Sequence, residues 1–135
     1  MELAKHVSHY SKDPSTQTGA VIAYDKKIVS IGYNGFPAGV EDHLDRLENR
    51  DTKLKLIIHC EMNAILNASE SVEGLTLYTY PFASCTRCAV HVIQAGICRV
   101  VAPKVVPERW QDEVELSMNL FREAGVEIKL YDLHS

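Results

Sequence analysis

The sequence predicts an α/β fold in which helices cover both faces of a mixed five-stranded sheet. Two β-rich runs surround a charged turn at residues 19–34, which is typical of an antiparallel hairpin. Three later strand-like segments are each separated from the next by a helix-like segment, so these strands should run parallel through right-handed crossovers. The 135 residues, 46% of them hydrophobic, are enough for a single domain, 1–135, with its own core.

The first part of the chain begins with a short helix and continues into the hairpin. Residues 2–10 place Leu3 and Val7 at helical spacing. The stretch SKDPSTQT at 11–18 is dense in Ser, Thr, Asp and Pro, which predicts a loop. Residues 40–55, after the hairpin, are strongly charged, and we interpret them as a solvated helical or irregular excursion.

The second part of the chain alternates helices and strands. Apolar residues recur at helical spacing in three segments, residues 59–68, 85–95 and 111–124. A glycine, which commonly ends a helix, directly follows the last two of these segments. The β-rich segments that complete the predicted sheet are residues 74–80, 98–103 and 126–132.

Composition and charge narrow the classes of function. The formal net charge is −4, which argues against a protein that grips a polynucleotide through a basic surface. A small anionic ligand stays compatible with this charge, because it needs only a local cluster of donors. The sequence has no membrane-spanning run, and its N-terminus MELAKHVSHY is too polar for a signal peptide. We therefore expect a cytoplasmic protein that binds neither membranes nor polynucleotides.

A Cys-x-x-Cys pair, Cys85 and Cys88, begins one predicted helix, and in a reducing compartment such a pair indicates metal or redox chemistry. Both sulfurs can reach one ion, and the helix N-terminus, with Ser84 as its N-cap, favours thiolates. His59, at the mouth of another helix, is the best third ligand. Three ligands with an open fourth position are typical of catalytic zinc, and Glu61 is suited to moving protons beside it.

Other interpretations stay open on the spacing alone. The cysteine pair could be buried in a helix without a metal, and a histidine that begins a helix is more often a cap or core residue than a ligand. His91, one turn past the pair, is a rival ligand, while His43 could bind a second metal or lie on the surface. Cys60 points away from its neighbour His59, and Cys98 begins an apolar strand, so both are poor fourth ligands.

The stretch His-Cys-Glu at 59–61, followed by Cys-Thr-Arg-Cys at 85–88, resembles the zinc-dependent cytidine/deoxycytidylate deaminase superfamily, whose signature is His-x-Glu and then Pro-Cys-x-x-Cys. Four stretches covering residues 11–101 nearly continuously resemble its deoxycytidylate (dCMP) deaminase branch: SKDPSTQTGAVI, IGYNGFPAG, HCEMNAILNA and QAGICRVV. Ser84 stands where the signature has proline, and both residue types can start a helix. The resemblance implies a three-layer α/β/α cytidine-deaminase-like fold.

For activity, the resemblance implies a zinc-dependent aminohydrolase that converts dCMP to dUMP and ammonia. His59, Cys85 and Cys88 would hold Zn²⁺, zinc-bound hydroxide would attack C4 of the pyrimidine, and Glu61 would be the proton shuttle. Deamination of another base or nucleotide, including adenosine in tRNA, is one alternative, and a zinc-binding module without turnover is another. The sequence does not decide between dCMP, CMP and a modified nucleotide.

For the substrate, the resemblance implies that Asn34 contacts the sugar and the pyrimidine, although a turn asparagine is the alternative on spacing alone. Backbone groups of Ala83 or Ser84 could read the base edge, and Tyr78 could pack against the ring unless it is a core residue. The branch is often hexameric and regulated by dCTP and dTTP, so a homo-oligomer such as a hexamer is also implied.

The phosphate group of a nucleotide monophosphate needs hydrogen-bond donors from the protein. We expect them mainly in the loop at 11–18, at Ser11, Lys12, Ser15 and Thr16. Asn63, shortly after the His-Cys-Glu motif, is a further candidate. Basic residues of the charged excursion are weaker candidates, because a run of charges is usually solvated surface: Arg46, Arg50, Lys53 and Lys55.

Overall fold

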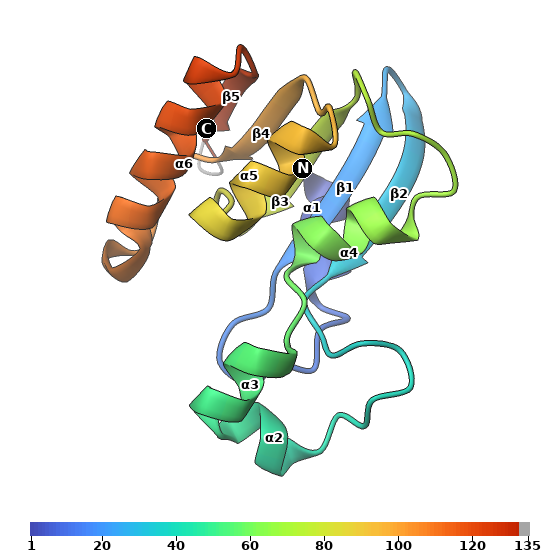
Figure 1. The fold of residues 1–135 in the computed structure, drawn as a ribbon, viewed down its shortest axis with the longest axis vertical. Helices are drawn as coiled ribbons and strands as arrows, with labels where there is room; N and C mark the ends of the chain where they lie inside the picture. The colour runs from blue at the N-terminus through green and yellow to red at the C-terminus, as the bar shows by residue number, and fades with distance from the viewer. Residues whose placement is uncertain (133–135) are drawn as a thin grey trace.

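A five-stranded sheet forms the centre of the protein, for which the computed structural model describes residues 1–132 (Figure 1). Its strands are β1 (Gly19–Tyr24), β2 (Lys27–Tyr33), β3 (Thr76–Tyr80), β4 (Arg99–Pro103) and β5 (Glu127–Tyr131). They lie in the order β2-β1-β3-β4-β5. The pairs β1–β2 and β1–β3 are antiparallel, whereas β3–β4 and β4–β5 are parallel. This confirms the predicted mixed sheet with parallel later strands.

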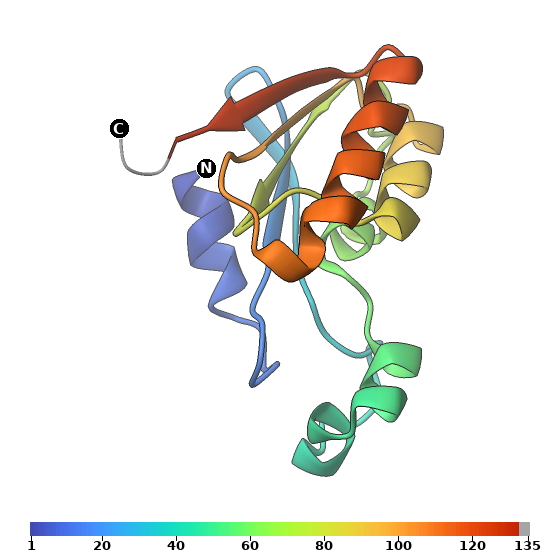
Figure 2. The same ribbon diagram turned by 90° about the vertical axis from the view of Figure 1, so that its left-hand side faces the viewer.

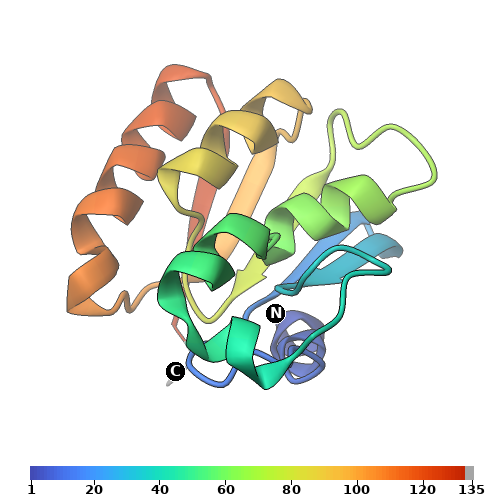
Figure 3. The ribbon, with the colours of Figure 1, turned by 60° about the horizontal axis from the view of Figure 1, so that its bottom comes forward.

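Helices cover both faces of the sheet, as predicted (Figure 2). They are α1 (Glu2–Ser8), α2 (Leu44–Glu48), α3 (Arg50–Leu56), α4 (Cys60–Asn67), α5 (Thr86–Gln94) and α6 (Gln111–Glu123), with a 3₁₀ turn η1 (Glu108–Trp110). Helix α1 packs on one face, and α4, α5 and α6 form the layer on the other. The charged excursion folds into α2 and α3, which project beyond one end of the sheet (Figures 1 and 2) and pack against each other (Figure 3). No helix within residues 1–132 combines the length and the apolar character that crossing a membrane requires.

Alternation along β3 decides which layer each side chain joins, because successive residues of a strand point to opposite faces. Leu77 is fully buried in the main core, together with Ile22 of β1 and Phe121 of α6. The next residue, Tyr78, lies in the smaller cluster that includes Val7 of α1. The main core therefore lies beneath the helices that carry the predicted metal ligands.

Gly32 of β2 allows α4 to lie directly on the sheet. A Cβ added at Gly32 would overlap the backbone nitrogen of Ala64 and the carbonyl oxygen of Cys60, both in α4. We expect Gly32→Ala to destabilise the protein by about 1–3 kcal/mol, as overpacking typically does. Urea denaturation measures this loss. Gly35→Ala is the matched control, because an added Cβ there meets no atom within 4 Å; equal stability of the two variants would contradict the prediction.

Candidate active site

His59, Cys85 and Cys88 come together between α4 and α5, with one donor atom of each within 4.8 Å of the others. The His59 Nδ1 atom lies 3.2 Å from Cys88 Sγ and 3.4 Å from Cys85 Sγ. One imidazole and two thiols at such distances suit tetrahedral zinc, and three ligands leave its fourth position open. Within the described part of the chain, the rival His91 is not in this group, nor is His43.

The starts of two helices position these donors. His59 is the N-cap of α4, and Cys85 is the N-cap of α5. This corrects the expectation that Ser84 caps α5: the helix begins one residue later, and the carboxylate of Glu113 in α6 accepts a hydrogen bond from the Thr86 backbone N–H instead. The Thr86 N–H in the first turn of α5 thus has a hydrogen-bond acceptor from another helix. The thiol of Cys85 is not needed to cap the helix and remains available to a metal.

The electrostatics of the two thiols fit a cation. Hydrogen bonding to Cys88 and to His59 lowers the pKa of Cys85 to about 4, against the opposing effect of burial. The hydrogen bond with Cys85, burial and the charge of Glu61 raise the pKa of Cys88 well above its ordinary range. Two neighbouring sulfurs, one of them readily ionised, suit a cation, because a metal binds thiolates and releases their protons.

Glu61 lies in the first turn of α4 and is buried. Its Oε1 atom accepts a hydrogen bond from the Cys60 thiol at 3.0 Å. Burial raises the pKa of Cys60 well above its ordinary value, so this thiol stays protonated and remains a donor. Glu61 lines the same cavity as His59 and Cys85, which places a buried carboxylate beside the metal donors.

The cavity has an aromatic wall and a polar wall. Phe82 stacks on Trp110, with ring centroids 5.9 Å apart and ring planes at 22°. Arg109 extends from η1 beside this pair, 5.8 Å from the Trp110 ring centroid. On the other side, Ser15 and Thr16 of the 11–18 loop line the cavity. Such a cavity offers an aromatic surface for a flat ring and donors for polar groups.

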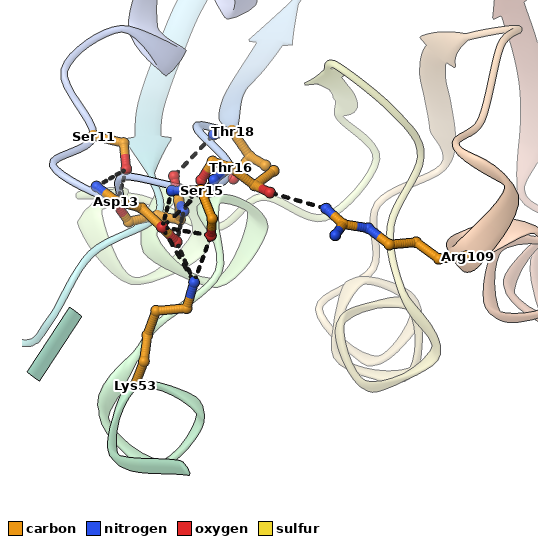
Figure 4. Close-up of polar contacts among 8 residues, drawn as sticks. Ser11, Asp13, Ser15, Thr16, Thr18, Lys53 and Arg109 are labelled. Atoms are coloured by element: carbon orange, nitrogen blue, oxygen red, sulfur yellow. Dashed lines mark hydrogen bonds and ion pairs between the residues drawn. The ribbon is translucent and has the colours of Figure 1, made fainter. Parts of the chain in front are cut away.

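Asp13 holds the 11–18 loop in shape (Figure 4). Its Oδ1 atom accepts hydrogen bonds from the backbone N–H and the hydroxyl of Ser15, at 2.9 and 3.0 Å. The Lys53 ammonium lies 3.1 Å from its Oδ2 atom. Burial opposes ionisation of Asp13, but the hydrogen bonds from Ser15 and Lys53 outweigh it and hold the pKa of Asp13 below its ordinary value. The loop therefore presents hydroxyls around a buried, ionised carboxylate.

Comparison with known proteins places the chain in a family. Residues 1–104 match the family model of the cytidine and deoxycytidylate deaminase zinc-binding region. The chain belongs to this family. An uncharacterized deaminase in the luxG 3′ region of Aliivibrio fischeri is 41% identical over 130 residues, which cover 94% of this chain and 87% of that one. The deoxycytidylate deaminase of Mus musculus is 40% identical over 130 residues, 90% of this chain and 71% of the mouse chain.

A solved structure shares the fold of this deaminase. The dCMP deaminase of cyanophage S-TIM5, crystallised in complex with dCMP and dUMP, matches with a TM-score of 0.78 at 24% sequence identity, over 96% of this chain and 92% of the phage chain. Family membership and the His, Cys, Cys group together confirm the predicted enzyme class and the zinc cofactor. The roles of individual site residues stay predictions.

Four of the residues predicted to bind substrate line the deaminase's cavity: Asn34, Ser15, Thr16 and Ala83. Asn34 is buried, and its side-chain amide forms hydrogen bonds with the 11–18 loop. Its Nδ2 atom donates to the Thr16 carbonyl at 2.8 Å, and its Oδ1 atom accepts from the Thr18 backbone N–H at 2.8 Å. Asn34 thus links β2 to this loop, in addition to any contact with a ligand.

Two residues predicted to contact the substrate do not line the cavity, and their contacts with a ligand stay predictions. Tyr78 points to the α1 face of the sheet, because it alternates with the core residue Leu77. Lys12 extends toward solvent and forms an exposed ion pair with Asp42 at 3.4 Å.

Three further predicted residues also lie outside the lining of the cavity, for local reasons. The buried Ser11 hydroxyl donates to the Asn34 carbonyl at 2.9 Å. Asn63 donates its side-chain amide to the Tyr33 carbonyl of β2 at 2.7 Å. Ser84 is buried beside the metal donor Cys85.

Sequence reasoning did not select Asp13, Phe82, Arg109 or Trp110, all of which line the cavity. Asp13 and Phe82 are direct neighbours of residues that the sequence predicted to bind substrate. Arg109 and Trp110 follow the end of the stretch that resembles the family, in the segment PERW at 107–110. A basic residue next to the single tryptophan of the chain was the available signal for this wall.

Proposed function

We propose that this deaminase converts dCMP and water to dUMP and ammonia. The observation that carries the proposal is Arg109, a cation that lines the same cavity as His59, Cys85 and Glu61 and donates to the Thr16 hydroxyl of the loop. The mouse relative, 40% identical, is named deoxycytidylate deaminase, which supports the same substrate. The homo-oligomer implied by the resemblance and the cytoplasmic location remain predictions.

Arg109 is the cation we assign to the 5′-phosphate. Lys53 and Arg109 reach the 11–18 loop from two sides (Figure 4). The charge of Lys53 is compensated by Asp13, whereas Arg109 donates to the neutral Thr16 hydroxyl at 3.2 Å. A guanidinium can bind a phosphate through two parallel hydrogen bonds, with the Thr16 hydroxyl as a further donor.

Glu61 is the residue we assign to proton transfer. When bound by His59, Cys85 and Cys88, zinc supplies a hydroxide nucleophile near neutral pH. The Glu61 carboxylate takes one proton from the attacking water and gives it to N3 of the pyrimidine. It then moves the proton of the hydroxyl group added at C4 to the amino group, which leaves as ammonia while the C4 carbonyl forms. The hydrogen bond from Cys60 orients Oε1, so that the other carboxylate oxygen can face the substrate. Ala83 and Asn34 remain our candidates for contacts with the base and the sugar.

The test of this function is ammonia release by the zinc-loaded protein with dCMP, CMP, deoxycytidine and dCTP compared under identical conditions. The proposal requires the highest kcat/KM with dCMP. A clear preference for the unphosphorylated nucleoside would overturn the phosphate assignment, and no turnover of any of these compounds would overturn the substrate class.

Arg109→Met should lower kcat/KM for dCMP by about ten- to hundredfold, because a charged hydrogen bond is lost, and should leave turnover of deoxycytidine unchanged. Steady-state kinetics with both substrates measure the difference. Arg122→Met is the matched control, since Arg122 lies exposed on α6 and donates only to Asn119 among the contacts described for residues 1–132. Equal losses with both substrates would argue against a phosphate contact.

A further inference from the structure

The α2–α3 arm, residues 36–57, forms one wall of the cavity but has little support from the rest of the protein. Among the helices and strands of residues 1–132, α2 and α3 pack only against each other. Both helices lie beyond the end of the sheet (Figures 1 and 2). Nevertheless, four residues of the arm line the cavity: Arg50, Lys53, Leu54 and Ile57. The position of the arm therefore determines the shape of the cavity.

Two kinds of contact hold the arm. At its base, Gly35 and Ile58 form a backbone bridge with N–O distances of 3.1 and 2.8 Å, which joins the two ends of the arm. Farther out, Lys53 of α3 reaches the 11–18 loop. Its ammonium lies 3.1 Å from the Asp13 carboxylate and 2.8 Å from the Ser15 hydroxyl (Figure 4).

The Lys53–Asp13 ion pair is protected from water, unlike the second ion pair between the arm and the loop. The side chains of Lys53 and Asp13 are only 16% and 4% exposed, compared with 72% and 35% for Lys12 and Asp42. Exposed pairs contribute little, whereas breaking a buried pair leaves a charge without compensation. Lys53 and Asp13 are thus the contact that can fix the arm.

We propose that the Lys53–Asp13 ion pair is a latch that holds the arm against the 11–18 loop and thereby sets the affinity of the cavity for its nucleotide. The assignment rests on the proposed function. Both residues line the cavity, and we assign them a positioning role because the charge of each is compensated by the other. Glu61 and the metal donors lie on α4 and α5, outside the arm, so the latch acts on binding and leaves the chemical step intact.

The size of the effect follows from the population of latched protein. When only a fraction of molecules has the closed cavity, the apparent dissociation constant is the intrinsic constant divided by that fraction. We expect loss of the latch to raise KM for dCMP by about tenfold, with kcat changed less than about twofold.

The test compares zinc-loaded Asp13→Asn and Lys53→Met with the wild type and with Asp42→Asn as matched control. Asparagine at position 13 can still accept the hydrogen bond from the Ser15 backbone, so it removes the charge and keeps the turn of the loop. Asp42→Asn removes the exposed ion pair between the same two segments. The readouts are KM and kcat for dCMP and amide hydrogen exchange over α2 and α3.

Both latch variants should raise KM and speed exchange of α2 and α3 while exchange of β1 and β3 stays at the wild-type rate. The double variant should be no worse than either single variant, and Asp42→Asn should match the wild type. Exchange of the arm at the wild-type rate in both latch variants, or a fall in kcat at constant KM, would overturn the latch. Exchange reports on the latch even if dCMP is not the substrate, so failure of the proposed function is recognised separately.

Discussion

Glu61→Gln is expected to lower kcat for dCMP by about a thousandfold or more, within the range that a positioned acid–base group supplies, while zinc content stays at the wild-type level. Glutamine has nearly the same shape as glutamate but cannot accept and return a proton. Its amide oxygen can still accept the hydrogen bond from Cys60, which keeps the side chain in place. The variant therefore separates proton transfer from folding and from metal binding.

Turnover at saturating dCMP and metal analysis of the same samples measure this prediction. Glu115→Gln is a suitable control, because Glu115 is an exposed residue of α6 and the substitution makes the same change of charge. Loss of zinc from Glu61→Gln would instead make Glu61 part of the metal site. Retained turnover would remove Glu61 from the reaction.

Patterns within short stretches of sequence were enough to predict the sheet and the metal donors. A parallel pair of strands separated by a helix allows few arrangements, and β3, β4 and β5 follow the expected one. The spacing of Cys85 and Cys88, with His59 at another helix start, likewise leaves few sites on which the three can converge. Both inferences depend on local geometry that the sequence specifies directly.

Contacts between distant segments could not be predicted in this way. Lys53 and Asp13 are 40 residues apart, and Arg109 and Thr16 are 93 apart, so neither pairing leaves a periodic signal. Tyr78 illustrates a different limit. A shift of one residue moves a side chain to the opposite face of a strand, so its assignment depends on which neighbours the sheet places against it.

Replacement of Cys88, a predicted zinc ligand, is the second large effect we expect. Cys88→Ala removes one of the three donors that lie within 4.8 Å of one another. Zinc affinity should fall by more than about a hundredfold, which exceeds the usual cost of losing only an outer partner of a metal ligand. Turnover of dCMP should fall with zinc occupancy. Competition with a chromogenic chelator measures the affinity, and ammonia release measures the turnover.

Cys98→Ala is the matched control for this prediction. Cys98 is an exposed thiol whose Sγ donates to the Gly74 carbonyl, away from the metal donors, so the variant should keep zinc and turnover. A Cys88→Ala protein with full zinc and full activity would contradict the assigned donor set.

Removal of zinc from the wild-type protein distinguishes a catalytic ion from a structural one. The main core, with Ile22, Leu77 and Phe121 fully buried, lies between the sheet and α4–α6 and does not depend on the metal donors for its apolar contacts. We therefore expect the chelated protein to keep its circular dichroism spectrum, to lose turnover and to regain it when zinc is added back. Structural zinc sites contribute folding energy outright, so unfolding on chelation would assign the ion to the fold. Retained secondary structure with reversible loss of activity would assign it to catalysis.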